Sequence, residues 1–174
     1  MKKGGVGGGK TITGLIFESR IGLETVLSTL PGYKVLDDIV YFKGTKIAEI
    51  YQKHKLYKKL LEPNGIDYTK IISKKLLPDD AILILKDKTL YVIEMKFQEV
   101  SGSVDEKLQT CGFKYQEYQK LLAPLNISVK YVYVLSDWFK KKEYKDVLHY
   151  VKSVDCHYFF NEIPLDFLGL PKPI

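Results

Sequence analysis

The fold is decided by one stretch, Pro78-Asp79-Asp80-Ala81-Ile82-Leu83-Ile84-Leu85-Lys86-Asp87-Lys88-Thr89-Leu90-Tyr91-Val92-Ile93-Glu94-Met95-Lys96. Two runs of apolar, β-branched and aromatic residues flank a short polar turn at residues 86–88, a pattern typical of a β-hairpin. Side chains alternate along a strand, so Glu94 and Lys96 share one face and the residue between them points away. Pairing of the two strands brings Asp79 or Asp80 alongside Glu94.

Two carboxylates and an ammonium group gathered in one place suit a hard divalent cation and phosphate chemistry. Mg²⁺ prefers oxygen ligands and keeps several of its waters, so two or three carboxylates and a substrate phosphate suffice to hold it. The alternative interpretation is structural. A Glu-x-Lys ion pair on an exposed strand face is common, and Pro-Asp commonly opens a turn.

This arrangement resembles the PD-(D/E)XK nuclease superfamily, in which an acidic pair holds Mg²⁺ and the lysine serves the attacking water. Gly14-Leu15-Ile16-Phe17-Glu18 lies upstream, and the segment from Phe97 to Thr110 opens a helix directly after the strand. With these flanking segments the chain looks like the type II restriction endonucleases of that superfamily. The resemblance covers roughly the stretch from Lys10 to Leu122.

The resemblance implies a role for each matching residue. Asp79 and Glu94 would hold the metal ion, and Lys96 would position the attacking water and stabilise the charged transition state. The superfamily pattern places the acid directly after the proline, which favours Asp79, and Asp80 remains the alternative ligand. Glu18 matches a first-helix glutamate that adds to the metal site, although an ordinary carboxylate beside an apolar stripe would look the same.

The implied activity is Mg²⁺-dependent hydrolysis of DNA phosphodiester bonds at a specific duplex sequence, with Mn²⁺ as a substitute. A homodimer is expected, because cutting both strands of a palindrome needs two sites related by two-fold symmetry. A DNA repair or junction-resolving nuclease, the cleaving subunit of a heteromeric restriction enzyme, and a non-catalytic DNA-binding protein with the nuclease fold are the alternatives. Lys10, Lys107 and Gln109 are candidates for DNA contacts.

Length and composition indicate a single globular domain of 174 residues, with 45% hydrophobic and 28% charged residues and a net charge of +6. That charge is compatible with a polyanionic partner. The two cysteines fit a reduced protein, and neither a signal peptide nor a membrane span is evident. We therefore expect a cytoplasmic protein. The scattered histidines and the lack of a Gly-x-Ser-x-Gly sequence disfavour a zinc site and a serine hydrolase.

The glycine-rich start imitates a nucleotide-binding loop. Residues 4–11 satisfy the G-x-x-x-x-G-K-[ST] pattern, but only Met1-Lys2-Lys3 precedes them, so the buried strand that anchors a working P-loop is missing. No nucleotide cofactor is expected. We interpret residues 1–12 as a flexible basic arm and residues 13–174 as one nuclease domain.

Periodicity and turn residues predict the other elements. We expect helices over residues 13–30, 56–61, 103–122 and 143–151, a hairpin around 43–45, and strands over 129–135 and 157–160. The fold class is α/β, with a central mixed β-sheet flanked by helices as in restriction endonucleases.

Overall fold

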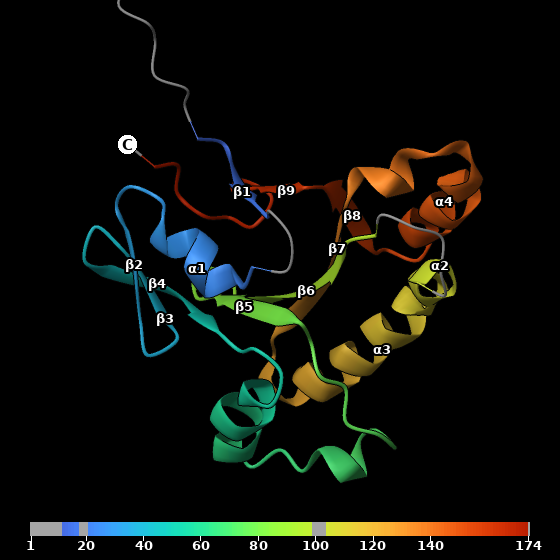
Figure 1. The fold of residues 1–174 in the computed structure, drawn as a ribbon. Coiled ribbons are helices and arrows are strands. Elements are labelled where there is room, and N and C mark those ends of the chain that lie inside the picture. The colour runs from blue at the N-terminus through green and yellow to red at the C-terminus, as the bar shows by residue number, and fades with distance from the viewer. Residues whose placement is uncertain (1–11, 18–20, 99–103, 174) are drawn as a thin grey trace, which may run out of the picture.

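A computed structural model describes residues 12–17, 21–98 and 104–173. Its centre is a seven-stranded sheet with the spatial order β2-β3-β4-β5-β6-β7-β8 (Figure 1). The strands are β2 (Tyr33–Leu36), β3 (Ile39–Phe42), β4 (Thr45–Ile50), β5 (Asp80–Ile84), β6 (Thr89–Lys96), β7 (Ser128–Leu135) and β8 (His157–Phe160). Neighbouring strands from β2 to β6 are antiparallel, whereas β6, β7 and β8 are parallel. The predicted mixed sheet is confirmed.

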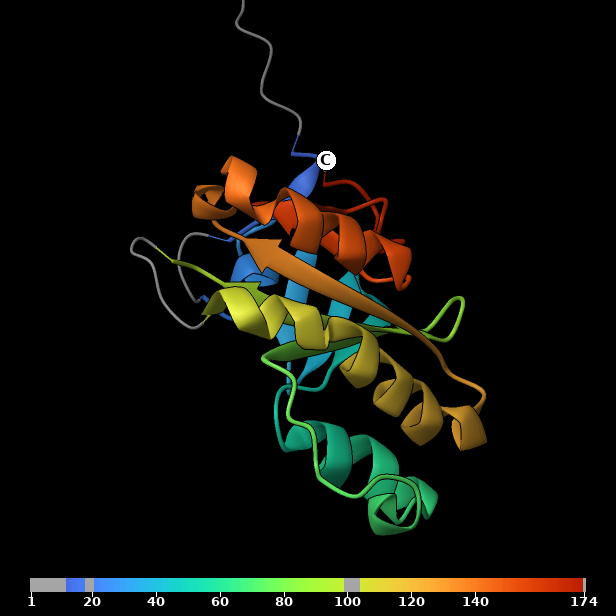
Figure 2. The ribbon, with the colours of Figure 1, turned by 90° about the vertical axis from the view of Figure 1, so that its right-hand side faces the viewer.

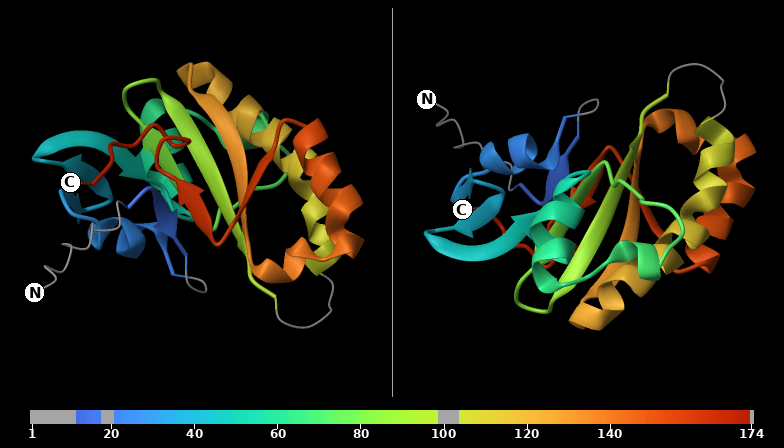
Figure 3. Two further views of the ribbon diagram at one scale, coloured as in Figure 1. Left: turned by 90° about the horizontal axis from the view of Figure 1, so that it is seen from above. Right: turned by 90° about the horizontal axis from the view of Figure 1, so that it is seen from below.

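Helices cover both faces of this sheet. They are α1 (Leu23–Ser28), α2 (Val104–Lys107), α3 (Cys111–Leu122) and α4 (Lys145–Ser153), joined by the short helical segments η1 (Leu56–Leu61), η2 (Glu62–Asn64), η3 (Tyr68–Lys70), η4 (Leu108–Thr110), η5 (Ala123–Leu125), η6 (Asp137–Lys140) and η7 (Lys142–Tyr144). A small second sheet pairs β1 (Gly14–Ile16) with β9 (Glu162–Pro164). Helices α3 and α4 lie on one side of the central sheet, and α1 with β1 lies on the other (Figure 3).

Each face of the sheet carries its own hydrophobic core, because successive strand residues point to opposite sides. Ala81 and Leu83 pack with α3, α4 and η1, while Ile82 and Ile84 pack with α1, β1 and the C-terminal segment. A strand buried on both faces reads as a continuous apolar run, which is how both strands of the β5–β6 hairpin appear in the sequence.

The helix predicted over residues 13–30 is wrong in its first half. Gly14–Ile16 forms β1, paired antiparallel with β9, and α1 begins only at Leu23. The partner strand lies near the other end of the chain, so local periodicity cannot reveal it. Ile16, at the end of β1, is 55% exposed.

The other predicted elements agree with the structure. The hairpins around residues 43–45 and 86–88 are confirmed, as are the strands over 129–135 and 157–160. The helix expected after residue 103 is divided into α2 and α3 by the single turn η4, and α3 ends before Pro124 as predicted. Residues 1–11 of the expected N-terminal arm lie outside the described residues. Within the described ranges, no helix has the length and apolar character needed to cross a bilayer.

Candidate active site

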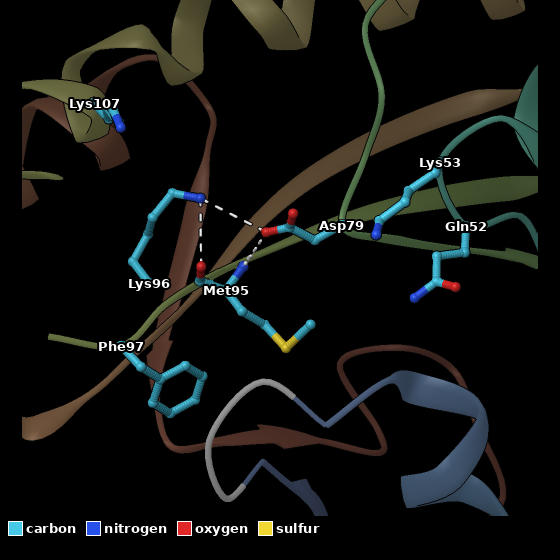
Figure 4. Close-up of a pocket in the computed structure, with 7 residues that line it drawn as sticks. All are labelled: Gln52, Lys53, Asp79, Met95, Lys96, Phe97 and Lys107. Atoms are coloured by element: carbon cyan, nitrogen blue, oxygen red, sulfur yellow. Dashed lines mark hydrogen bonds and ion pairs between the residues drawn. The ribbon is translucent and has the colours of Figure 1, made fainter.

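The predicted carboxylates and lysine converge where β5 begins and β6 ends. The register pairs Asp80 with Ile93, so Asp79, the residue before β5, lies next to Glu94 when the register is continued by one residue. The Nζ atom of Lys96 lies 2.9 Å from Oε2 of Glu94 and 3.7 Å from Oδ2 of Asp79. The same Asp79 oxygen accepts a hydrogen bond of 3.0 Å from the backbone amide of Met95 (Figure 4). One ammonium group therefore connects carboxylates from two neighbouring strands.

Glu94 is 5% exposed, and a different ammonium group faces each of its carboxylate oxygens. Lys96 contacts Oε2, and Lys114 of α3 lies 3.4 Å from Oε1. The Lys96 side chain is itself only 15% exposed. The ion pair is therefore buried, unlike the exposed strand-face pair considered as the structural alternative. A buried carboxylate needs such partners, because an unpaired charge in the interior is costly.

Sequence reasoning missed Lys114, Gln52 and Lys53. Lys114 lies three residues after Cys111 and four before Tyr118, both of which are buried. Residues with that spacing share a helix face, and a lysine beside a buried stripe requires an acidic partner. That spacing was the available signal. Gln52 and Lys53 come from the loop after β4, where no motif marks them.

Asp80 points to the opposite face of the sheet from Asp79. Its Oδ2 atom accepts a hydrogen bond of 2.9 Å from the backbone amide of Leu23, the first residue of α1. Burial raises the pKa of Asp80 to about 6. The Leu23 hydrogen bond lowers this pKa and the nearby charge of Asp79 raises it, both by less than burial does. Alternation along the strand thus leaves Asp79 facing Glu94, while Asp80 fixes the start of α1.

A pocket of about 310 Å³ opens beside these groups (Figure 4). Its lining consists of Gln52, Lys53, Asp79, Met95, Lys96, Phe97 and Lys107. Three of these residues are lysines, so the pocket is suited to an anion. Lys107, predicted as a DNA contact, is among them. Gln109 is not, because it is exposed on a separate surface beside Val147 and Tyr150.

Asp79 supplies hard oxygen atoms in the pocket wall, whereas Glu94 is buried next to the pocket without lining it. One or two carboxylates with waters and substrate phosphate are the usual Mg²⁺ shell, and these two carboxylates fit that shell by their chemistry. No cluster of three or more His, Cys, Asp or Glu side chains suited to a metal ion occurs in the described part of the chain. Glu18 and Lys10, predicted as a further ligand and a DNA contact, lie outside that part.

Comparisons with protein-family models, with curated proteins and with solved structures gave no match for this chain. The functional conclusion therefore rests on the residues and geometry of the chain itself.

Proposed function

We propose that this protein is a Mg²⁺-dependent DNA endonuclease that hydrolyses phosphodiester bonds at a specific duplex sequence, in the manner of a type II restriction enzyme. The observation that carries the proposal is the placement of Lys96. Its ammonium group lies 3.7 Å from Asp79 and 2.9 Å from Glu94, beside a lysine-lined pocket. Two carboxylates and a lysine beside a lysine-lined pocket are groups with which metal-assisted phosphodiester hydrolysis can be carried out.

Asp79 and Glu94 would hold Mg²⁺ or Mn²⁺, and Glu18 is proposed as a further ligand. When bound, the ion would neutralise charge on the scissile phosphate and lower the pKa of a coordinated water. The Asp79 side chain is 42% exposed, so it can be reached from the pocket. Glu94 contributes from the buried side of the same site.

Lys96 is proposed to position the attacking water and to stabilise the negative charge of the transition state. Because its side chain is largely buried, its attraction for a phosphate oxygen is screened less than that of a surface lysine. Its hydrogen bond to Glu94 fixes the ammonium group before substrate arrives. Lys53 and Lys107 at the pocket supply further charge for the phosphates next to the reacting one.

Lys114 has a distinct role in this scheme as a positioning residue. With Lys96 on one oxygen and Lys114 on the other, the charge of Glu94 is balanced inside the protein. The carboxylate is thereby kept in place at the end of β6 without a compensating ion.

Plasmid DNA incubated with purified protein and Mg²⁺ tests the proposal. Discrete fragments support a restriction-type enzyme, and smearing indicates a nonspecific nuclease. Intact plasmid supports a non-catalytic binding protein instead. The matched variants are Asp79→Asn and Asp80→Asn, which make the same chemical change on opposite faces of β5. Cleavage should fall far more in Asp79→Asn, and an equal loss in both would contradict the assigned site. Sedimentation of the active protein tests whether it is the homodimer that cleavage of both strands is proposed to need.

A further inference from the structure

Almost all of the net positive charge of the chain lies in the segment between β4 and Asp79. Residues 52–77, here called the basic lobe, contain seven lysines and two acidic residues, namely Lys53, Lys55, Lys58, Lys59, Lys70, Lys74 and Lys75 with Glu62 and Asp67. The lobe therefore has a net charge of +5, compared with +6 for the whole chain of 174 residues. The rest of the protein is close to neutral.

The basic lobe is attached directly to the candidate active site. It begins at Gln52 and Lys53 in the pocket wall, and it ends at Leu77, two residues before Asp79 in the same wall. The backbone amide of Lys53 donates a hydrogen bond of 3.0 Å to the carbonyl of Pro78, which ties the two ends of the lobe together. From there the lobe projects away from the sheet, beyond α3 (Figure 2).

The lobe is attached to the core by buried leucines and closed by hydrogen bonds between its two ends. Leu56, Leu60 and Leu61 of η1 are buried in the core on the α3 side. The Tyr57 hydroxyl donates to the carbonyl of Leu76 at 2.8 Å and accepts from its amide at 2.9 Å, so the first and last segments of the lobe are joined. Because the leucines of η1 pack into the core, its exposed side carries lysines and lacks the apolar face by which amphipathic helices enter membranes.

Part of the positive charge is used inside the protein. Lys55 and Lys59 each lie 2.5 Å from a different oxygen of Asp38, which fixes the lobe to the β2–β3 turn. These two lysines lower the pKa of Asp38 against the opposing effect of burial. When the negative charge of Asp38 is added to the charge of the lobe, a net charge of +4 remains.

The remaining charge faces solvent. Lys58 and Lys74 are exposed, and neither makes an ion pair with any residue in the described ranges. Lys53 is also exposed and lies at the pocket. The lobe thus carries exposed lysines both at the pocket, where Lys53 lies, and beyond it, where Lys58 and Lys74 lie.

We propose that the basic lobe binds the phosphate backbone of duplex DNA, with Lys53 at the pocket and Lys58 and Lys74 contacting phosphates farther along the duplex. This inference rests on the proposed nuclease function. Duplex DNA carries one negative charge per about 1.7 Å of its axis, and each neutralised phosphate releases condensed counterions. Such contacts set affinity and register but read no bases. The lobe therefore supplies binding strength, and sequence discrimination comes from other surfaces.

The test compares two double variants that remove the same charge. Lys58→Gln with Lys74→Gln neutralises the lobe. Lys142→Gln with Lys145→Gln is the control, since these lysines are also exposed and make no ion pair with a described residue. The Kd for a fluorescent duplex oligonucleotide is measured in Ca²⁺ between about 50 and 200 mM salt. Thermal midpoints confirm that all proteins are folded.

At 0.1 M salt the lobe variant should bind duplex DNA roughly eightfold more weakly for each lost contact. In a plot of log Kd against the logarithm of the salt concentration, its slope should be smaller than that of the wild type by about 2. The control should keep the wild-type slope. An unchanged slope in the lobe variant, or an equal loss in the control, would overturn the assignment of the lobe and leave the nuclease proposal standing. Failure of the wild type to bind duplex DNA would overturn both.

Discussion

Replacing Lys96 with methionine removes the ammonium group that, within the described residues, contacts both carboxylates of the site. Glu94 is then left as a buried charge with Lys114, at 3.4 Å, as its remaining cationic partner. Removing one partner of a buried ion pair costs about 3–5 kcal/mol. Because Lys114 remains, we expect a smaller loss of about 2 kcal/mol in the free energy of unfolding. For a chain of this size that loss lowers the thermal midpoint by about 4–8 °C.

This stability loss is expected whether Lys96 is catalytic or only structural, because the pair is buried. A second variant separates the two roles. Glu94→Gln with Lys96→Met removes both charges of the pair and should recover part of the lost stability, since position 94 no longer holds a buried charge and Lys114, which loses its partner, is partly exposed. It should not recover cleavage, because a metal ligand and the transition-state charge are both missing.

The measurements are the thermal midpoint and the single-turnover cleavage rate of the wild type, Lys96→Met and the double variant. Turnover should fall by about a hundredfold or more in Lys96→Met, as it does when a single charge-stabilising group is lost. Binding of duplex DNA in Ca²⁺ should persist in that variant. Cleavage at the wild-type rate by a folded Lys96→Met protein would refute the role assigned to Lys96.

Burial raises the pKa of Asp80 to about 6. Above that pH the ionised carboxylate therefore lowers the free energy of unfolding by up to about 3 kcal/mol. This loss of stability disappears as the pH falls below about 4. Asp80→Asn should therefore raise the thermal midpoint more at about pH 8 than at about pH 4, and an equal effect at both would count against a buried, ionised Asp80. Mg²⁺ or Mn²⁺ should support cleavage, while Ca²⁺ should support binding alone because its larger, looser shell misplaces the water; full activity in chelator would rule this out. Lys10→Ala should weaken DNA binding modestly with no ATP affinity to lose, and micromolar ATP binding by the wild type would restore the nucleotide-binding interpretation.

Local features of the sequence were sufficient to predict the hairpin that carries the site. The polar turn and the apolar runs define β5 and β6, and alternation alone places Glu94 and Lys96 on one face. The choice between Asp79 and Asp80 depended on the strand register. Asp79 and Asp80 are adjacent, so they point to opposite faces, and a register shift of one residue would exchange the faces that they occupy.

Features that depend on distant partners could not be predicted in this way. β1 takes its structure from β9, and the local apolar spacing around it imitates a helix. Lys114 reaches Glu94 only because α3 packs across the sheet. The basic lobe could have been found from the sequence by counting charge along the chain, although its attachment to the pocket comes from the fold.

The change of strand direction at β6 also has a consequence for the order of folding. β2 to β6 are linked mostly by short turns, whereas β7 joins only after the crossover through α2 and α3. Contacts between residues close in sequence form sooner, because less loop entropy is lost. We therefore expect Asp79 and Glu94 to meet before Lys114 reaches Glu94. Because Lys96 belongs to the same hairpin and contacts both carboxylates, their repulsion is already offset at that stage, and Lys114 adds its charge to Glu94 only when the crossover has packed.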